Sequence, residues 1–182
     1  INYINSDTLN SVIFVDSTIG YAVGNNGFVM KDSLGFWFKV HRKNGLQFNS
    51  VYFSNYNTGF CAGSAGVIYN TSNGGYSWRD FQTNSTTKLS DVKFLNSNTG
   101  YVVGSNGKIF KTTDGGVSWV EQNSGTNFTL NSVYFVDYKS GWIGANGAIL
   151  HTSDGGDNWE IQQNNVYVRT IKFNNANLGW AT

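Results

Sequence analysis

Short runs of alternating apolar and polar residues recur along the chain, separated by glycine-rich or polar stretches. Such alternation predicts half-buried β-strands, and no window has the spacing of an amphipathic helix. Five segments share a pattern that ends in phenylalanine: 9–14, 48–53, 89–94, 130–135 and 168–173. These phenylalanines lie 39, 41, 41 and 38 residues apart. The pattern therefore predicts an all-β protein built from a repeat of about 40 residues.

Up to three further features follow each phenylalanine at nearly constant spacing. A glycine and an aromatic residue begin six residues later, and a second glycine cluster comes next. A Ser/Thr-x-Asp-Gly-Gly-x-x-Trp pattern, or a close variant, then closes three repeats at 71–78, 112–119 and 152–159. Gly, Asn and Asp favour tight turns between antiparallel strands. Each repeat therefore predicts a four-stranded antiparallel meander, which is the blade of a β-propeller.

The repeats divide the chain into a single propeller region, 1–182, with about four and a half blades. We expect blades at approximately 9–47, 48–88, 89–129 and 130–167, and a partial blade at 168–182. Residues 1–8 are expected to be the end of a preceding blade. Since the sequence begins and ends inside a blade, we expect it to belong to a larger ring of seven blades. Further sequence, or self-association with a second copy, would complete that ring.

The closing pattern resembles the Asp box, or bacterial neuraminidase repeat. Taken with the strand and glycine patterns before it, the whole chain is most similar to the photosystem II assembly and stability factor family. The first copy departs from the motif because Leu34 stands where the Asp belongs, and the second has Asn73 there. The resemblance implies that the boxes are structural turns away from any catalytic face. We expect that structural role for six residues: Asn73, Trp78, Asp114, Trp119, Asp154 and Trp159.

Composition excludes several kinds of partner. The 12 basic and 11 acidic residues give a net charge of +1, so no surplus of positive charge favours nucleic-acid binding. No apolar run approaches the ~18 residues of a membrane span. His41, His151 and the single cysteine, Cys61, are not arranged at metal-ligand spacing. We therefore expect no metal and no cofactor.

Candidate binding residues lie at two places in the predicted blades. The turns between second and third strands share a face with the connections between blades, and they contribute Asn26, Asn106 and Asn146. The innermost strands contribute Asp91 and Arg169. The loops on this face are short, which favours a broad, shallow contact over a deep pocket.

Catalytic residues are not predicted. A sialidase needs several converging arginines, but only Arg169 of the three arginines falls on a predicted inner strand. Glycosidases need two carboxylates about 5–10 Å apart. Both glutamates, Glu121 and Glu160, fall on predicted outer strands, which leaves Asp91 without a visible partner.

These observations favour a non-enzymatic binding or scaffolding module. The resemblance implies a protein partner, and a glycan is the second ligand to consider. One alternative is an Asp-box glycoside hydrolase or sialidase relative whose catalytic groups lie outside this chain. Another is a structural subunit of a cell-surface assembly. The polar, lysine-poor surface suggests an exported bacterial protein, located in the periplasm, at the cell surface or outside the cell.

Overall fold

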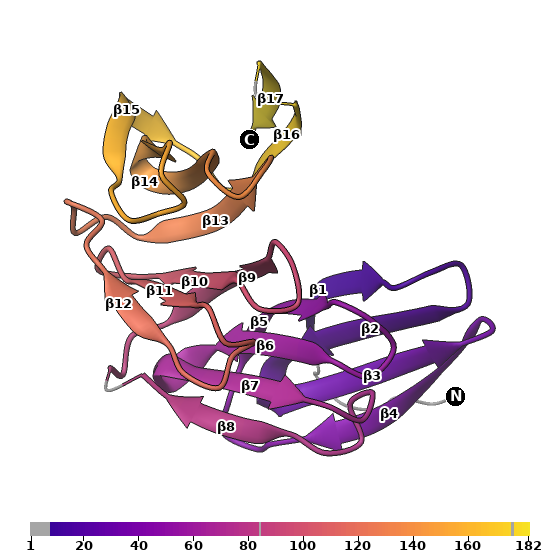
Figure 1. Ribbon diagram of the computed structural model, residues 1–182. Coiled ribbons are helices and arrows are strands. Elements are labelled where there is room, and N and C mark those ends of the chain that lie inside the picture. Colours follow the sequence, from indigo (N-terminus) through magenta and orange to yellow (C-terminus); the bar gives the residue numbers. More distant parts are fainter. Residues whose placement is uncertain (1–7, 84, 176) are drawn as a thin grey trace.

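The computed structural model describes residues 8–83, 85–175 and 177–182, which form five antiparallel sheets (Figure 1). The first contains β1 (Leu9–Phe14), β2 (Ile19–Gly24), β3 (Phe28–Ser33) and β4 (Phe36–Arg42). The second contains β5 (Phe48–Phe53), β6 (Gly59–Gly63), β7 (Val67–Thr71) and β8 (Arg79–Gln82). The third contains β9 (Leu89–Phe94), β10 (Gly100–Gly104), β11 (Ile109–Thr112) and β12 (Val120–Gln122). The short 3-10 turns η1 (Asn25–Gly27) and η2 (Ser64–Gly66) join second to third strands.

The remaining two sheets hold β13 (Leu130–Phe135), β14 (Gly141–Thr152) and β15 (Glu160–Tyr167), then β16 (Ile171–Asn175) and β17 (Leu178–Ala181). β14 is a single element where the sequence predicted two strands and a turn. Its rings at Trp142 and His151 nevertheless lie only 4.8 Å apart. Nine residues of straight strand would separate them by ~30 Å. β14 therefore folds back on itself, and its two arms take the places of the second and third strands.

The sheets follow one another in sequence order along an arc, from the indigo β1–β4 sheet to the yellow β16 and β17 (Figure 1). The first strand of each sheet contacts the first strand of the next, along the series β1, β5, β9, β13 and β16. These are the innermost strands. The predicted all-β propeller of four-stranded blades is thereby confirmed, whereas the seven-bladed ring remains a prediction. Within the described ranges, no helix has the length and apolar character needed to cross a membrane.

Aromatic rings form the contacts between neighbouring sheets. In the first four sheets, the aromatic residue of the second strand stacks on the repeat phenylalanine in the first strand of the next sheet. The stacked pairs are Tyr21–Phe53, Phe60–Phe94, Tyr101–Phe135 and Trp142–Phe173, with ring centres 3.5–4.3 Å apart. The same phenylalanines meet the Asp-box tryptophans edge to face, in Phe53–Trp78, Phe94–Trp119 and Phe135–Trp159. Offset-stacked and edge-to-face pairs are favourable aromatic geometries. The repeated residues therefore build the core between sheets.

The glycine that begins each second strand makes room for these rings. A Cβ atom placed on Gly100 would lie 2.7 Å from the Phe94 ring, and one on Gly141 would lie 2.4 Å from the Phe135 ring. Because the ring lies directly across the glycine, any side chain there would push the phenylalanine out of its stack. The constant six-residue spacing between phenylalanine and glycine in the sequence reflects this contact.

A candidate binding groove along the inner strands

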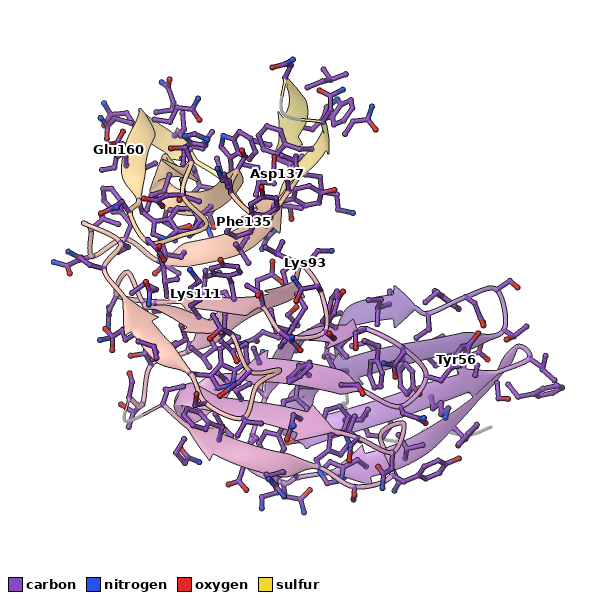
Figure 2. The ribbon with its side chains drawn as sticks, in the orientation of Figure 1. Tyr56, Lys93, Lys111, Phe135, Asp137 and Glu160 are labelled. Atoms are coloured by element: carbon purple, nitrogen blue, oxygen red, sulfur yellow. The ribbon has the colours of Figure 1, made fainter. Side chains whose placement is uncertain are left out.

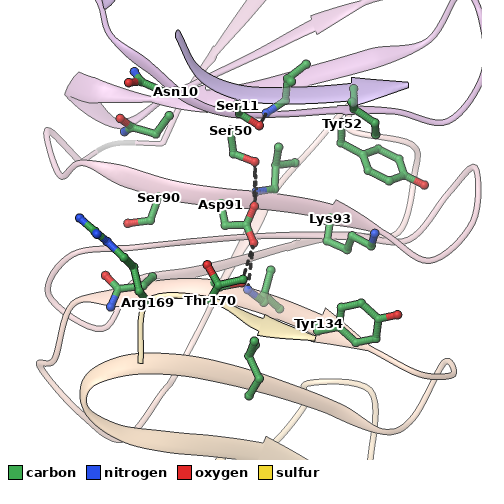
Figure 3. A pocket seen from close by; sticks show the side chains of 18 of the residues that line it. Asn10, Ser11, Ser50, Tyr52, Ser90, Asp91, Lys93, Tyr134, Arg169 and Thr170 are labelled. Atoms are coloured by element: carbon green, nitrogen blue, oxygen red, sulfur yellow. Dashed lines mark hydrogen bonds between the residues drawn. The ribbon is translucent and has the colours of Figure 1, made fainter. Parts of the chain in front are cut away.

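The inner strands line a groove of about 360 Å³ to which all five sheets contribute (Figure 3). Each strand presents the same four successive repeat positions to it. The second of these positions is a small polar residue in four sheets and Asp91 in the third sheet. The full set at that position is Ser11, Ser50, Asp91, Ser132 and Thr170. The groove is therefore polar along its middle.

Asp91 links three neighbouring inner strands. Its Oδ1 accepts hydrogen bonds from the Ser50 hydroxyl of β5, at 2.7 Å, and from the backbone N–H of Val92, at 2.9 Å. Its Oδ2 accepts from the backbone N–H of Val133 in β13, at 3.0 Å, and from the Ser132 hydroxyl, at 3.3 Å. Figure 3 shows this chain of contacts across the groove. The carboxylate therefore connects β5, β9 and β13 through four donors.

The electrostatic state of Asp91 follows from its surroundings. Removal of the carboxylate from water raises the pKa of Asp91, because burial disfavours the charged form. The four hydrogen bonds act in the opposite direction, and burial is the larger effect. Asp91 thus lies where the sequence predicted it, on an inner strand, and it lines the groove. Its oxygens are already occupied by protein donors.

A second set of links uses the asparagine that precedes the small polar residue. The amide nitrogen of Asn10 donates to the Phe48 carbonyl at 2.7 Å, and that of Asn49 donates to the Leu89 carbonyl at 2.6 Å. The amide of Asn131 donates to the Val168 carbonyl at 2.7 Å. Each bond joins one sheet to the next. We did not predict this role, although recurrence of asparagine in three repeats was the signal that could have revealed it.

The two ends of the groove differ in chemistry. At one end the repeat position is filled by Asn10, Asn49, Ser90, Asn131 and Arg169. At the other end it is filled by Ile13, Tyr52, Lys93, Tyr134 and Lys172. Figure 3 shows Asn10 and Arg169 at one end, and Tyr52, Lys93 and Tyr134 at the other. Arg169 precedes β16 and is exposed, so it lines the groove as expected but lies just outside the strand.

The three predicted turn asparagines have structural tasks. Asn26 and Asn106 adopt positive φ angles of 57° and 59°, in the left-handed region that asparagine tolerates better than most residues. Asn146 lies within β14, where its Oδ1 accepts a hydrogen bond from the amide of Asn131 at 2.5 Å. Turn geometry and sheet contacts thus account for these residues. None of the three lines the groove with Asp91 and Arg169, and a binding role for them stays a prediction.

The Asp boxes are self-contained turns between third and fourth strands. In the third sheet, Asp114 Oδ1 accepts from the Thr112 hydroxyl at 2.8 Å and from the Ser118 N–H at 2.9 Å. Asp154 and Asn73 make the same two kinds of contact in their own boxes. Trp119 and Trp159 are buried beside the turns, and the partly buried Trp78 donates its indole N–H to the Gly75 carbonyl. These contacts fit the structural role proposed for the six residues.

Acid should weaken these turns. Hydrogen bonds, above all from the side chain and N–H of the residue four positions on, lower the pKa of Asp114 and of Asp154 to about 2. A carboxyl group whose pKa is lower in the folded state than in the unfolded state stabilises the folded state. This contribution is fully present above the unfolded pKa of about 4 and is lost as the pH falls through the folded pKa of about 2. We therefore expect the thermal unfolding midpoint to decrease between about pH 4 and pH 2.

The double variant Asp114→Asn, Asp154→Asn tests this expectation. It should fold normally, because Asn73 already makes the same contacts in the second box. Its unfolding midpoint, followed by circular dichroism, should depend less steeply on pH in that window. Some dependence should remain, because hydrogen bonds from Tyr56 and Thr18 also lower the pKa of Asp16 to about 2. An unchanged slope would show that the boxes do not carry the acid sensitivity.

Other titratable groups do not form a metal centre in the described part of the chain. No group of three or more His, Cys, Asp or Glu side chains gathers there. Glu121 and Glu160 lie on the outer strands β12 and β15, as the sequence predicted. Figure 2 shows Glu160 on the outer side of its sheet.

Comparisons with known proteins agree with this architecture. The structure of YCF48 from Cyanidioschyzon merolae has a TM-score of 0.77 and 14% identity over the whole of this chain and 68% of that one. A structure of YCF48 bound to D1 peptide has a TM-score of 0.56 and 17% identity, covering all of this chain and 92% of the other. An ancestral GH74 enzyme has a TM-score of 0.75 and 18% identity over 92% of this chain but only 26% of its own.

The GH74 enzyme of Niastella koreensis has a TM-score of 0.74 and 14% identity, covering 89% of this chain and 33% of the enzyme. At such identities these likenesses show the fold alone. No curated protein matches the sequence significantly. The family model described as photosynthesis system II assembly factor YCF48 matches residues 76–168, just over half of the sequence. The chain therefore belongs to the photosynthesis system II assembly factor YCF48 family.

Proposed function

We propose that this chain is a non-enzymatic propeller scaffold that binds a segment of another protein along its inner-strand groove. The observation that carries the proposal is the groove itself, which gathers equivalent polar positions from five sheets into one continuous surface. A family relative has been seen bound to D1 peptide, which supports a peptide as the kind of ligand.

The contacts of Asp91 support binding over catalysis. A general acid or base must be free to exchange a proton with the substrate. Asp91 instead accepts four hydrogen bonds, three of which come from the neighbouring strands β5 and β13. The groove thus offers a surface of amides, hydroxyls, tyrosines and cations around a carboxylate that is already engaged. Such mixed polar and aromatic surfaces are typical of protein recognition.

Alternative functions remain predictions with their own tests. Hydrolysis of a panel of fluorogenic glycosides would favour a glycoside hydrolase whose catalytic groups lie outside this chain. Ordered self-association at low concentration would favour a structural subunit of a surface assembly. Location outside the cytoplasm is part of our proposal, and fractionation of the source cells would test it.

A groove-blocking variant tests the proposed function. Ser90 lines the groove and makes no side-chain hydrogen bond to another described residue, so Ser90→Trp should fill the space without breaking a link between sheets. Val117→Trp is the matched control, because Val117 is 75% exposed on the third Asp-box turn. The probes are the D1 peptide of the related structure and a displayed library of random 12-residue peptides.

We expect calorimetry to find peptides that bind the original chain and the Val117→Trp control alike, but bind Ser90→Trp at least tenfold more weakly. Circular dichroism should confirm that both variants are folded. The proposal is wrong if neither probe yields a binding peptide, or if all binding peptides are indifferent to Ser90→Trp.

A further inference from the structure

Tyr52, Lys93 and Tyr134 form a distinct cluster at one end of the groove. They occupy the same repeat position on the adjacent strands β5, β9 and β13. The Lys93 Nζ lies 5.4 Å from the centre of the Tyr52 ring and 5.7 Å from that of Tyr134. Figure 3 shows the three side chains extending from neighbouring strands towards the same end of the groove. We call this cluster the tyrosine–lysine rim.

The polar ends of the rim are not engaged within the part of the chain that the structure describes. Most other polar groups along the inner strands bridge neighbouring sheets, as Asp91 and Asn49 do. No described residue forms a hydrogen bond or ion pair with the Lys93 ammonium or with either phenol. Burial raises the pKa of Tyr52, so its hydroxyl stays protonated and can donate. Lys93 thus contacts two aromatic rings, but its ammonium and the two phenols have no hydrogen-bond or ion-pair partner among the described residues.

The charge around the rim favours an anion. Lys93 and Lys172 lie at this end of the groove and Arg169 at the other, whereas Asp91 is the one carboxylate among the groove residues. Desolvation of Asp91 raises its pKa, and its oxygens already accept four hydrogen bonds from the protein. An ammonium partly sheltered between two aromatic rings attracts a carboxylate more strongly than one in open water. A tyrosine hydroxyl beside the bound carboxylate would supply a directional hydrogen bond to it.

Apolar surface adjoins the rim. A second hollow, of about 310 Å³, begins at Lys93 and is lined in part by Phe94, Leu95 and Val136. Asp137 also borders it, but its Oδ1 is held by the backbone N–H groups of Lys139 and Ser140. Figure 2 shows Lys93, Phe135 and Asp137 in the same region of the molecule. A carboxylate at the rim could therefore be accompanied by a neighbouring apolar side chain.

We propose that the tyrosine–lysine rim is a carboxylate-binding subsite for the bound protein segment. It would receive an acidic side chain or a C-terminal carboxylate, with the Lys93 ammonium as the charged partner and the phenol of Tyr52 or of Tyr134 as the neighbouring donor. This inference rests on the proposed function, since it names the chemistry that one end of the groove selects.

Three tetrapeptide probes separate the two sources of carboxylate. The first is apolar, with a blocked N-terminus and a free C-terminal carboxylate, and the second is its C-terminal amide. The third has both ends blocked and one internal glutamate. Binding is followed by NMR of 13C-methylated lysines, and the Lys93 signal is assigned with Lys93→Met. Lys39→Met is the matched control, because Lys39 is an exposed lysine on the outer strand β4.

We expect at least one carboxylate probe to shift the Lys93 signal, while the amide does not. Lys93→Met should weaken its binding about tenfold. Tyr52→Phe or Tyr134→Phe, whichever removes the phenol beside the bound carboxylate, should weaken it several-fold, because it removes a hydrogen bond to a charged group. Lys39→Met should bind normally. The probe that binds, free terminus or internal glutamate, identifies the source.

Equal binding of the amide, or unchanged binding to Lys93→Met, would overturn the subsite. Absence of binding by every probe would overturn it too. Library peptides that bind the original chain but not Ser90→Trp would still support the proposed function in those cases. The two hypotheses therefore fail on different measurements.

Discussion

Phe94→Ala is expected to lower the free energy of unfolding by about 3–5 kcal/mol, the usual cost of deleting a buried aromatic ring. Phe94 is 3% exposed and lies at the centre of three ring contacts. It stacks on Phe60 of the preceding sheet at 4.1 Å, and it meets Trp119 of its own sheet edge to face at 5.8 Å. Its ring also covers Gly100. Removing it would leave a cavity between two sheets.

Phe14→Ala is the matched control for this prediction. Phe14 occupies the same repeat position and precedes a glycine by the same six residues, yet it is 54% exposed. Its only ring partner among the described residues is Trp37, at 5.9 Å. Its loss should therefore cost about 1 kcal/mol or less, as is usual away from a packed core. Urea unfolding followed by tryptophan fluorescence would give both values.

If Phe94→Ala does not fold, Phe94→Leu provides the comparison. Leucine keeps most of the buried apolar volume but loses the stacking geometry, so we expect a loss between those of the two alanine variants. Similar costs for Phe14→Ala and for the Phe94 substitutions would contradict the role assigned to the rings between sheets.

Asp91→Ala should cost about 1–3 kcal/mol, because it leaves buried donors on two neighbouring strands without an acceptor. The backbone N–H of Val133 is the most affected, since it makes the shorter of the two hydrogen bonds from β13 to Asp91 and, unlike the Ser132 hydroxyl, cannot rotate to another acceptor. Asp91→Ser should cost less. Serine is the residue at this position in three other sheets, and the Ser11 hydroxyl accepts a hydrogen bond from the Val51 N–H of the next sheet.

The pH dependence distinguishes Asp91 from the Asp-box residues. Because burial raises the pKa of Asp91, its contribution to stability is fully present below the unfolded pKa of about 4. That contribution is lost as the pH rises through the higher folded value. The stability gap between the original chain and Asp91→Ser should therefore be larger at pH 4 than at pH 7. Urea titrations at both pH values measure this difference in the free energy of unfolding. A difference that is larger at pH 7 than at pH 4 would contradict the prediction.

The fold could be predicted from the sequence because the same residues recur at a constant spacing. Phenylalanine and the glycine six residues later are packed against each other in the structure, so their spacing recorded a direct contact. The first-to-second strand turns were less visible. Asp16, Asn55, Asn96 and Asp137 each cap such a turn through backbone N–H groups two and three residues on. Either Asp or Asn occupies this position, which made the turn motif harder to recognise in the sequence.

The candidate site was predicted only in part. Asp91 and Arg169 could be assigned to the groove, because inner strands are recognisable from their pattern. The tyrosine–lysine rim could not be assigned, because Tyr52, Lys93 and Tyr134 lie about 40 residues apart and look unrelated in sequence. They become neighbours only when the sheets are placed side by side. Asn26 and Asn106 suggested binding, but turn geometry requires a residue that accepts a positive φ.

Within each repeat, the residues that pack between sheets are different from the residue that faces one end of the groove. Each sheet interacts mainly with its immediate neighbours, so the free energy of folding is approximately a sum over single sheets and neighbouring pairs of sheets. The contacts between sheets use the same residue types in each repeat: phenylalanine, glycine, and valine or isoleucine. The residue between the valine or isoleucine and the phenylalanine of each inner strand varies, and the position is occupied by Ile13, Tyr52, Lys93, Tyr134 and Lys172. Substitution of this one residue in each blade can therefore change what the groove binds, while the residues that pack between the sheets stay the same.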